Sequence, residues 1–465
     1  MKKPFIILIF FSLLACNKDK PVFLLEVNVT VGFNKANLYW DKVFDKSELV
    51  LYQFYSGDQL IWEGENTYHY EFTDLEENTS YAGLIKASNN SGVLLASGQF
   101  NFTTTKNQPP SIFTISINKI SSTQVDFEWT RAVDFDEGVA TYSVILDDKI
   151  LADHTDNRAY SISGLEPETN YKIRVIASDN QGNKTEVPIS VNTLKKGAEI
   201  SQNFAQFIGI KREYCLYKPS NAPGSRLPLV IYLHGWSNII WPGMITDYFP
   251  ALAEEENFML LMPQAKAAMG GQTAWDSHNI HNWDDASFIN ELIDLMVSDY
   301  QVNDQQVYIT GFSNGGFMTF YLSQVLEDRL AAVAPIAGLM DLSNFAKYSL
   351  KKPMPLCYIH GTADSVVKVG GDVNHVSFDK ILDYFIQKNG VDPTPLVTQL
   401  PDTYIYDNST VTKIEYTTLS SSADIIYYRI NSCGHSIPGR SWSNRDIHAF
   451  DVIWDFFKTR KLSDK

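Results

Sequence analysis

One stretch limits the fold of this chain more than any other: Val307 to Leu326, which reads VYITGFSNGGFMTFYLSQVL. Four residues typical of a strand run into the pentapeptide GFSNG, and apolar residues then recur at helical spacing. A serine hydroxyl is a weak nucleophile, so catalysis needs it on a sharp turn that a base can reach. Glycines two residues before and two after Ser313 leave room for such a turn. The stretch predicts a nucleophilic serine, and the alternative is a turn with no catalytic role.

Length and charge exclude several classes of protein. A chain of 465 residues is too long for one core, so we expect two to four domains. The 54 acidic residues outnumber the 38 basic ones, and the net charge of −16 argues against binding to nucleic acid or to an anionic membrane surface. The four cysteines show no paired spacing, which suggests neither a disulfide-dense scaffold nor a zinc site. We expect no metal and no cofactor.

The amino terminus has the pattern of a targeting segment. Lys2 and Lys3 precede an apolar run from Phe5 to Ala15, which is too short to span a bilayer. The run ends in Leu-Leu-Ala-Cys, which resembles a bacterial lipobox and implies cleavage before Cys16 and lipid attachment to it. The alternative is an ordinary secretory signal. We therefore expect an extracytoplasmic protein, either a bacterial membrane lipoprotein held by its lipid alone, on the periplasmic side or the cell surface, or a secreted one.

Residues 22–196 contain an internal repeat of short alternating runs separated by turn residues, typical of β-sandwiches. Trp40 aligns with Trp129 at an offset of 89 residues. A second set aligns at an offset of 90, namely Leu75, Thr79 and Tyr81 with Leu165, Thr169 and Tyr171. We expect each unit to bury its tryptophan and to close a corner with its tyrosine.

The repeated units resemble fibronectin type III domains. Residues 165–171, LEPETNY, match that family's L-x-P-x-T-x-Y, whereas residues 75–81, LEENTSY, lack the proline. The resemblance implies two all-β, immunoglobulin-like sandwiches. Such modules act more often as spacers than as binding sites, so any contact with glycans is expected to be weak.

From about residue 205 the pattern changes to buried apolar runs that alternate with helical periodicity. The expected strands are 229–233, 259–262, 307–310, 332–336, 355–359 and 425–430. One helix face is expected to carry Ile289, Leu292, Ile293, Met296 and Tyr300. This pattern predicts an α/β domain with a mostly parallel sheet covered by helices.

The stretch Leu233-His234-Gly235-Trp236 follows the first of these strands. Acyl transfer needs two N–H donors aimed at the developing oxyanion. We expect one from Asn314 and the other from Gly235 or Trp236. The alternative is that His-Gly only ends the strand.

Residues 359–364, IHGTAD, place an acid just after a strand, at the sheet edge where ligands bind. We expect Asp364 to orient the catalytic histidine. Asp372 and Asp379 are rivals further from the strand end, and His360 is interpreted as structural.

The glycine-flanked stretch at residues 431–439, NSCGHSIPG, follows the last strand and supplies His435 as the base. The rivals are His375 and His448, the second of which we expect at the surface. The order Ser313, Asp364, His435 is that of the α/β hydrolases.

The carboxy-terminal region resembles the secreted esterases that include polyhydroxybutyrate depolymerases, feruloyl esterases and acetylxylan esterases of carbohydrate esterase family one. The matching segments are LVIYLHG (229–235), MPQ (262–264), DDASFI (284–289), VYITGFSNGG (307–316), HGTAD (360–364) and GHSIPG (434–439). The resemblance implies that Ser313, Asp364 and His435 are the triad. The Ser-Asn-Gly-Gly sequence is closer to the feruloyl and small-ester branch, and residues 391–424 have the character of an insertion.

Aromatic residues near the predicted site could form a wall for a ring-bearing substrate. The candidates are Trp236, Trp241 and Trp275. Ile437 is a further candidate for substrate binding, because it stands where relatives often have a tryptophan and so bears on the shape of the acyl pocket. Trp283 is interpreted as part of the core. A bridge between Cys433 and Cys357 would fix the histidine loop.

Taken together, the sequence predicts a multidomain protein that hydrolyses carboxylic esters. The expected segments are a signal peptide at 1–15, a lipidated linker at 16–21, two fibronectin type III-like domains at 22–107 and 108–197, and an α/β-hydrolase domain at 203–465. Expected substrates are feruloyl or acetyl esters of plant polysaccharide, or hydroxyalkanoate polyesters. The alternatives are a serine peptidase of the same fold and a non-catalytic, carbohydrate-binding surface lipoprotein.

Overall fold

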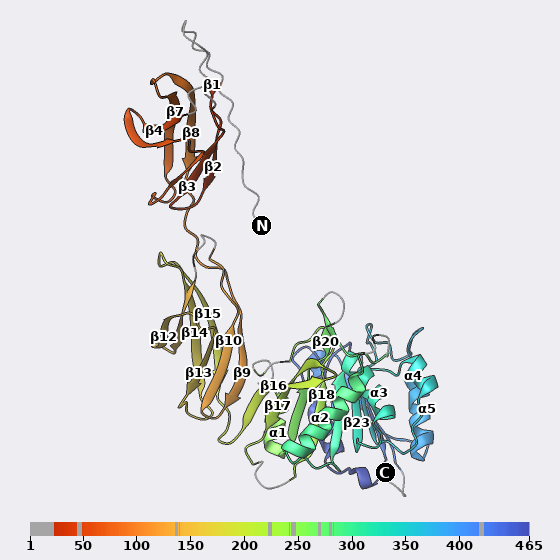
Figure 1. Ribbon diagram of the computed structural model, residues 1–465. Helices are drawn as coiled ribbons and strands as arrows, with labels where there is room; N and C mark the ends of the chain where they lie inside the picture. The colour runs from red at the N-terminus through yellow and green to blue at the C-terminus, as the bar shows by residue number, and fades with distance from the viewer. Residues whose placement is uncertain are drawn as a thin grey trace. The chain divides into compact units, whose positions relative to one another are not determined.

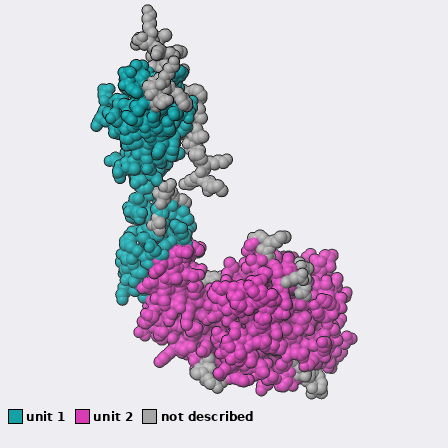
Figure 2. Space-filling model, viewed as in Figure 1, with its two compact units in different colours: residues 1–113, 131–156, 174–187 teal, residues 114–130, 157–173, 188–465 magenta. Residues whose placement is uncertain are grey.

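The computed structural model describes residues 23–43, 49–134, 138, 140–221, 226–240, 242, 248–267, 271–278, 281, 283–417 and 423–464. Two compact units divide the chain (Figure 2). Unit 1 contains residues up to 113, 131–156 and 174–187, and unit 2 contains residues 114–130, 157–173 and 188 onwards. Among the described residues, no helix has the length and hydropathy that a membrane span requires.

The first repeat forms two sheets with the strand orders β1-β8-β7-β4-β5 and β2-β3-β6 (Figure 1). Their bounds are β1 (Phe23–Leu24), β2 (Val27–Val31), β3 (Ala36–Trp40), β4 (Val50–Ser56), β5 (Gln59–Glu65), β6 (His69–Phe72), β7 (Ser80–Asn89) and β8 (Leu94–Thr103). Residues from both sheets share one core, in which the ring of Trp40 packs edge-on against Phe54. Alternate residues of β4 and β8 are buried because successive side chains of a strand point to opposite faces.

The second repeat contributes β9 (Ile115–Ser121), β10 (Gln124–Trp129), β11 (Thr141–Leu146), β12 (Lys149–Thr155), β13 (Ala159–Ser163), β14 (Asn170–Ser178) and β15 (Lys184–Asn192). The order β12-β11-β14-β15 makes a four-stranded sheet, and β13-β10-β9 belongs to a larger one. Trp40 and Trp129 are both buried, as predicted.

The two repeats share hydrogen bonds at matching positions. The Tyr81 hydroxyl accepts from the Glu76 N–H at 2.9 Å, and the Tyr171 hydroxyl accepts from the Glu166 N–H at the same distance. The Thr104 hydroxyl donates to the Glu76 carbonyl at 2.6 Å, and its counterpart in the second repeat has the same bond length. Each tyrosine thus closes a corner of its repeat, as the aligned sequences predict.

A 13-stranded sheet has the order β13-β10-β9-β16-β17-β19-β18-β22-β23-β24-β27-β26-β25. Its remaining strands are β16 (Glu199–Phe207), β17 (Ile210–Lys218), β18 (Leu229–Leu233), β19 (Met259–Pro263), β22 (Val307–Phe312), β23 (Ala332–Ile336), β24 (Leu356–Gly361), β25 (Leu396–Gln399), β26 (Thr410–Tyr416) and β27 (Ile425–Asn431). The run from β19 to β27 pairs in parallel, and the flanking pairs are antiparallel. A separate short hairpin joins β20 (Lys266–Ala267) and β21 (Thr273–Ala274).

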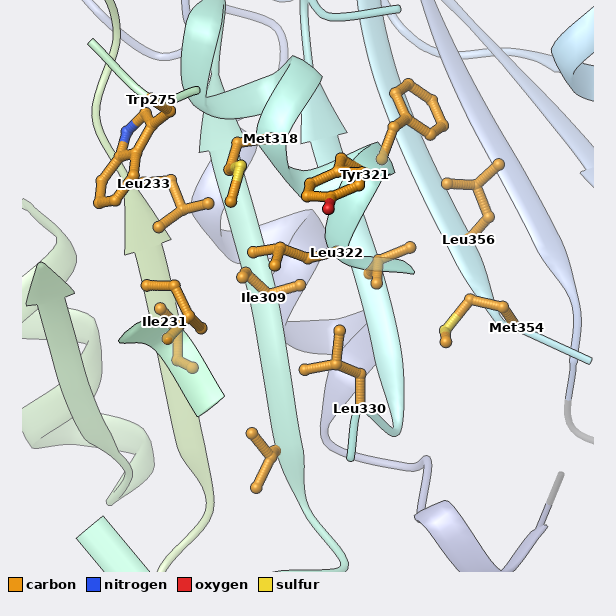
Figure 3. Close-up of a cluster of buried hydrophobic side chains, with 14 of the residues drawn as sticks. Ile231, Leu233, Trp275, Ile309, Met318, Tyr321, Leu322, Leu330, Met354 and Leu356 are labelled. Carbon is orange, nitrogen blue, oxygen red and sulfur yellow. The ribbon is translucent and has the colours of Figure 1, made fainter. Parts of the chain in front are cut away.

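Helices lie on both faces of the parallel strands (Figure 1). They are α1 (Tyr248–Glu256), α2 (Asp285–Asp299), α3 (Asn314–Val325), α4 (Leu342–Lys347), α5 (Phe378–Asn389) and α6 (Ala449–Phe457), with short 3-10 turns η2 (Ile405–Asp407) and η3 (Leu462–Asp464). Neighbouring residues of β22 point to opposite faces. The Tyr308 ring stacks on Phe457 of α6, whereas Ile309 lies beside Leu322 of α3 (Figure 3). The α3 and α6 helices therefore cover opposite faces.

The main core lies between these strands and the helices α2, α3 and α5, and Figure 3 shows the part beside α3. Leu233 of β18 and Met318 of α3 are fully buried, and Trp275 packs beside them. This packing fixes the carboxyl ends of β18 and β22 against the start of α3.

The predicted bridge between Cys433 and Cys357 is wrong, because both cysteines are free and buried. Cys357 pairs with Ile426, whereas Cys433 lies beside Gly361, four residues further along β24. Four strand residues span about 13 Å, well beyond the Cα separation that a disulfide allows.

Candidate active site

Ser313 occupies the turn between β22 and α3, so the strand–turn–helix order predicted for the motif is present. Its backbone has φ 56° and ψ −116°, a conformation that residues other than glycine rarely adopt. Its N–H donates to the Ile336 carbonyl at 2.9 Å, and its own carbonyl accepts from Phe317 N–H at 3.0 Å. Strain of this kind costs about 1–3 kcal/mol and is concentrated at functional sites.

Two glycines of the motif let the helix approach the sheet closely. A Cβ atom on Gly315 would lie 2.1 Å from the Leu233 carbonyl oxygen, and one on Gly311 would lie 2.4 Å from the Gly315 oxygen. Neither contact is tolerable for a real side chain. The spacing in G-x-S-x-G therefore follows from packing between α3 and the end of β18.

Asp364 lies in the loop after β24 and binds His435, which follows β27. Its Oδ2 is 2.7 Å from His435 Nδ1, and its Oδ1 accepts the N–H groups of Val366 and Val367 at 2.9 and 2.8 Å. Burial alone would raise the pKa of this carboxyl. Hydrogen bonds from His360, His435 and the Val367 N–H outweigh burial and hold the pKa of Asp364 below its ordinary value.

The His435 ring also lies beside the serine turn. It packs on the ring of Phe312, the residue before the nucleophile, with centroids 4.8 Å apart. Within the described residues the Ser313 hydroxyl makes no hydrogen bond to His435. The structure thus joins the acid and the histidine directly, and brings the serine close through Phe312. Catalytic hydrogen bonds are often loose before a substrate binds.

The rival residues have other partners. Asp372 accepts from His375 Nδ1 at 2.8 Å, and the Nε2 atoms of His375 and His278 are 3.1 Å apart. Asp379 lies in the first turn of α5. His448, expected at the surface, precedes α6 and is half-buried. In the described part of the chain, no three His, Cys, Asp or Glu side chains form a group that could hold a metal ion.

The loop after β18 lies against the serine turn. A Cβ atom on Gly235 would be 3.5 Å from the Phe312 carbonyl oxygen. Trp236 is exposed, and its Nε1–H donates to Gln272 Oε1 at 2.9 Å. The Asn314 side chain is used for structure, since its Oδ1 accepts the Trp275 N–H at 2.7 Å. Its backbone N–H, at the start of α3, remains the predicted oxyanion donor.

Two residues to which the sequence assigned no role in the site hold this loop. His234 is buried, with Nδ1 2.7 Å from the Gly235 carbonyl, and its Nε2 accepts the Ala265 N–H at 3.0 Å. Gln264 Oε1 accepts the Ile240 N–H at 2.6 Å, and its Nε2 lies 3.0 Å from His234 Nε2. Both belong to motifs used for the family resemblance, LHG and MPQ, which was the only signal available.

The proposed aromatic wall is only partly open to solvent. Trp236 is 52% exposed, whereas Trp275 is 2% exposed and donates its Nε1–H to the His234 carbonyl at 3.0 Å. Trp275 therefore supports the loop from the core, and Ile437 is also buried. Trp283 is half-buried and stacks on His281 with centroids 4.5 Å apart. Trp241 lies outside the described residues.

Two family models match separate parts of the chain. Residues 108–192 match the fibronectin type III domain, and residues 272–390 match a family described as Phospholipase/Carboxylesterase. The second match contains Ser313 and Asp364 and ends before His435.

Characterised relatives match parts of the chain. A bifunctional acetylxylan esterase/xylanase of Neocallimastix patriciarum is 31% identical over 34% of this chain and 22% of its own length. Feruloyl esterase D of Neurospora crassa is 24% identical over 57% of this chain and 87% of its own length. Among solved structures, an acetyl xylan esterase from Aspergillus awamori is 17% identical, with a TM-score of 0.39 over 56% of this chain and 99% of that one. The chain thus spans about a fifth of the first relative.

The resemblance that the motifs predicted is confirmed. The matched relatives carry the names acetylxylan esterase, feruloyl esterase and poly(3-hydroxyalkanoate) depolymerase. The chain contains a fibronectin type III domain and an esterase-like hydrolase segment.

Proposed function

We propose that this chain is a serine esterase that hydrolyses carboxylic esters through Ser313, His435 and Asp364. The observation that supports it best is the 2.7 Å contact between His435 Nδ1 and Asp364 Oδ2, beside a strained serine turn. The names of the matched relatives favour an ester substrate over a peptide.

The proposed reaction starts when His435 takes the proton of Ser313 as the serine oxygen attacks the ester carbonyl. Asp364 binds Nδ1, so Nε2 is left to act as the base. The oxyanion would be stabilised by the N–H groups of Asn314 and of Gly235 or Trp236, at the positive end of α3. The alcohol leaves with the proton from His435, and water activated by His435 then releases the acid from Ser313.

For the substrate, we propose feruloyl or acetyl esters carried by plant polysaccharide, with hydroxyalkanoate polyesters as the second class. Trp236 is exposed in the loop of the predicted oxyanion site and is the best-placed aromatic residue for a ring-bearing acyl group. This choice of esters follows the relatives' names.

We further propose that the protein acts outside the cytoplasm, anchored by lipid on Cys16, with residues 22–107 and 108–197 as two sandwich modules that serve as spacers or weak glycan contacts. The triad would lie in a domain that covers residues 203–465. One matched relative, from Arthroderma benhamiae, is named a secreted protein.

The test is hydrolysis of p-nitrophenyl acetate and methyl ferulate by the wild type and two serine variants. Ser313→Ala should lower kcat/KM by roughly 10³-fold or more, because it removes the nucleophile. Ser323→Ala is the matched control, since Ser323 is a buried serine of α3, the helix that follows Ser313, and only donates to the Phe320 carbonyl. This variant should keep nearly full activity.

An active Ser313→Ala variant would refute the assignment of the nucleophile. A wild type that is inert on both esters but cleaves the matched p-nitroanilide would support the peptidase alternative instead. The ratio of the two ester activities chooses between the acetyl and feruloyl branches.

A further inference from the structure

A second histidine contacts the proposed triad aspartate at the carboxylate oxygen that also contacts His435. His360, at the end of β24, is fully buried, and its Nε2 lies 3.2 Å from Asp364 Oδ2 and 2.8 Å from the Val367 carbonyl oxygen. The same carboxylate oxygen, Oδ2, binds His435. Oδ2 of Asp364 is therefore in contact with two imidazole rings.

The other nitrogen of His360 faces a tyrosine that has a partner of its own. His360 Nδ1 makes a short hydrogen bond with the Tyr358 hydroxyl, and this hydroxyl lies 2.8 Å from the Gly338 carbonyl oxygen. Burial raises the pKa of Tyr358 well above its ordinary value, so the hydroxyl keeps its single proton.

The charge of His360 follows from counting the protons in this row of hydrogen-bonded groups, from Gly338 through Tyr358 and His360 to Asp364. A carbonyl oxygen only accepts, so the Tyr358 hydroxyl donates to Gly338 and has no proton left for Nδ1. Nδ1 must then donate to the tyrosine oxygen. Nε2 faces a carbonyl and a carboxylate, which also only accept, so Nε2 donates as well. If the ring were neutral, one of these buried contacts would join two acceptors with no hydrogen between them.

We propose that His360 is held as a doubly protonated imidazolium in contact with Asp364, and that it is a positioning residue which sets the charge that the carboxylate presents to His435. This inference rests on the proposed function and gives the histidine of the HGTAD segment a role in the reaction. The cation neutralises part of the aspartate charge and thereby limits how strongly Asp364 favours protonation of His435.

The surrounding charges leave Asp364 as the principal counter-ion. Arg429 of β27 pairs in register with His360 and is exposed, and Asp379 lies in the first turn of α5. Lys368, in the loop after Asp364, is also exposed. On β24 itself, Tyr358 is neutral. In the loop that follows, Asp364 accepts hydrogen bonds from two backbone N–H groups and contacts both histidines.

The first test is ¹⁵N NMR of the protein with labelled histidine, in which the His360 signals are assigned by their loss in His360→Gln. We expect both ring nitrogens of His360 to have the shift of a protonated nitrogen from pH 6 to 8. One protonated and one unprotonated nitrogen in the wild type would overturn the proposal. This measurement does not depend on activity, so it stands even if Ser313 proves not to be the nucleophile.

The second test is the pH profile of kcat/KM for p-nitrophenyl acetate. Removing a cation beside the triad makes protonation of the base easier, so the acid limb of His360→Gln should move to higher pH by about half a unit or more, roughly three-fold in proton concentration. Tyr358→Phe should move it in the same direction, because it removes the acceptor of Nδ1–H. The control variant, His448→Gln, should leave the limb in place.

A purely structural role for His360 would lower kcat without moving the acid limb. An active His360→Gln variant with the wild-type limb would therefore contradict the proposal. If that variant does not fold, the wild-type His360 signals are assigned by their change in shift in Tyr358→Phe, which alters the partner of Nδ1, and the NMR result decides. Activity that persists in Ser313→Ala would refute the proposed function and leave the NMR result unchanged.

Discussion

His234 connects the carboxyl ends of two neighbouring strands at the proposed site. One ring nitrogen contacts the Gly235 carbonyl, and the other accepts the Ala265 N–H, just after β19. Nε2 is therefore unprotonated and Nδ1 carries the proton. Burial lowers the pKa of His234 to about 4, although the bond to Gly235 opposes this shift. The ring is neutral at physiological pH, and the loop that would supply an oxyanion donor depends on that neutral form.

This pKa predicts an acid-sensitive stability. Between pH 6.5 and about 4 the unfolded state binds a proton on His234 that the folded state does not, so the free energy of unfolding falls as pH falls. The loss approaches about 3 kcal/mol across that window. Urea unfolding at pH 7 and pH 5 should show a smaller difference for His234→Gln than for wild type. His154→Gln, which alters an exposed histidine, should behave as wild type, and equal pH differences in all three proteins would refute the argument.

At the residue scale, the sequence identified the site residues that directly follow a strand. It did not identify the residues whose partners are set by how two strands pair. Ser313, Asp364 and His435 each follow a run that was recognisable as a strand, and strand ends of a parallel sheet meet at one edge. The partner of His234 is 31 residues away, and only the pairing of β18 with β19 brings the two together. The burial of Trp275 in the core could not be predicted either, because its loop shows no hydrophobic periodicity.

At the scale of elements, a buried ion pair fastens α2 to β17. Arg212 Nη2 is 2.8 Å from Asp285 Oδ1, with the two side chains 5% and 1% exposed. The second carboxylate oxygen accepts the Asp276 N–H at 2.8 Å, and the guanidinium lies 3.9 Å from the centre of the Phe288 ring. The pair thus also holds the segment that follows Trp275.

Asp285→Ala should be strongly destabilising, because it leaves the Arg212 charge buried without its carboxylate. We expect a loss of about 3–5 kcal/mol in the free energy of unfolding, measured in urea. The matched control is Asp294→Ala on the same helix, whose partner Arg329 is 2.6 Å away in an exposed pair. That change should cost at most about 1 kcal/mol. Similar small losses in both variants would show that the buried pair contributes little.

Most elements of the carboxy-terminal region were predictable and a few were not. The strand expected at residues 229–233 has those bounds, and those at 332–336 and 425–430 agree within one residue. Continuous apolar runs of this kind can be recognised as buried strands from the sequence. The hairpin of β16 and β17 was not predicted, because β16 mixes polar and apolar residues without a clear period. The segment 391–424, expected as an insertion, contains β25, η2 and β26 at the sheet edge.

At the scale of the whole molecule, the compact units do not follow the expected domain boundaries. The strands of the second repeat, predicted at residues 108–197, are found in both units. The boundaries of that domain stay a prediction. Within unit 2, β9 pairs with β16 from Glu199 to Ser201, so part of the repeat continues into the large sheet. A repeat in the sequence reveals similar elements but not which edge strands pair with their neighbours.

The proposed anchor predicts a change in the location of the whole protein. In a bacterial host, the wild type should enter the membrane fraction and incorporate a labelled fatty acid, because diacylation holds a protein at a bilayer. Cys16→Ser should lose the label and move to the soluble fraction. A wild type that is cleaved but never labelled would support the ordinary secretory signal instead.

The most direct test of the central claim is covalent labelling of the nucleophile. The protein is treated with a fluorophosphonate at neutral pH, and peptides are mapped by mass spectrometry. The account predicts one phosphonylated serine, Ser313, with labelling much slower in His435→Gln because the serine loses its base. An unlabelled Ser313 in a protein that still hydrolyses esters, or labelling at another serine, would contradict it.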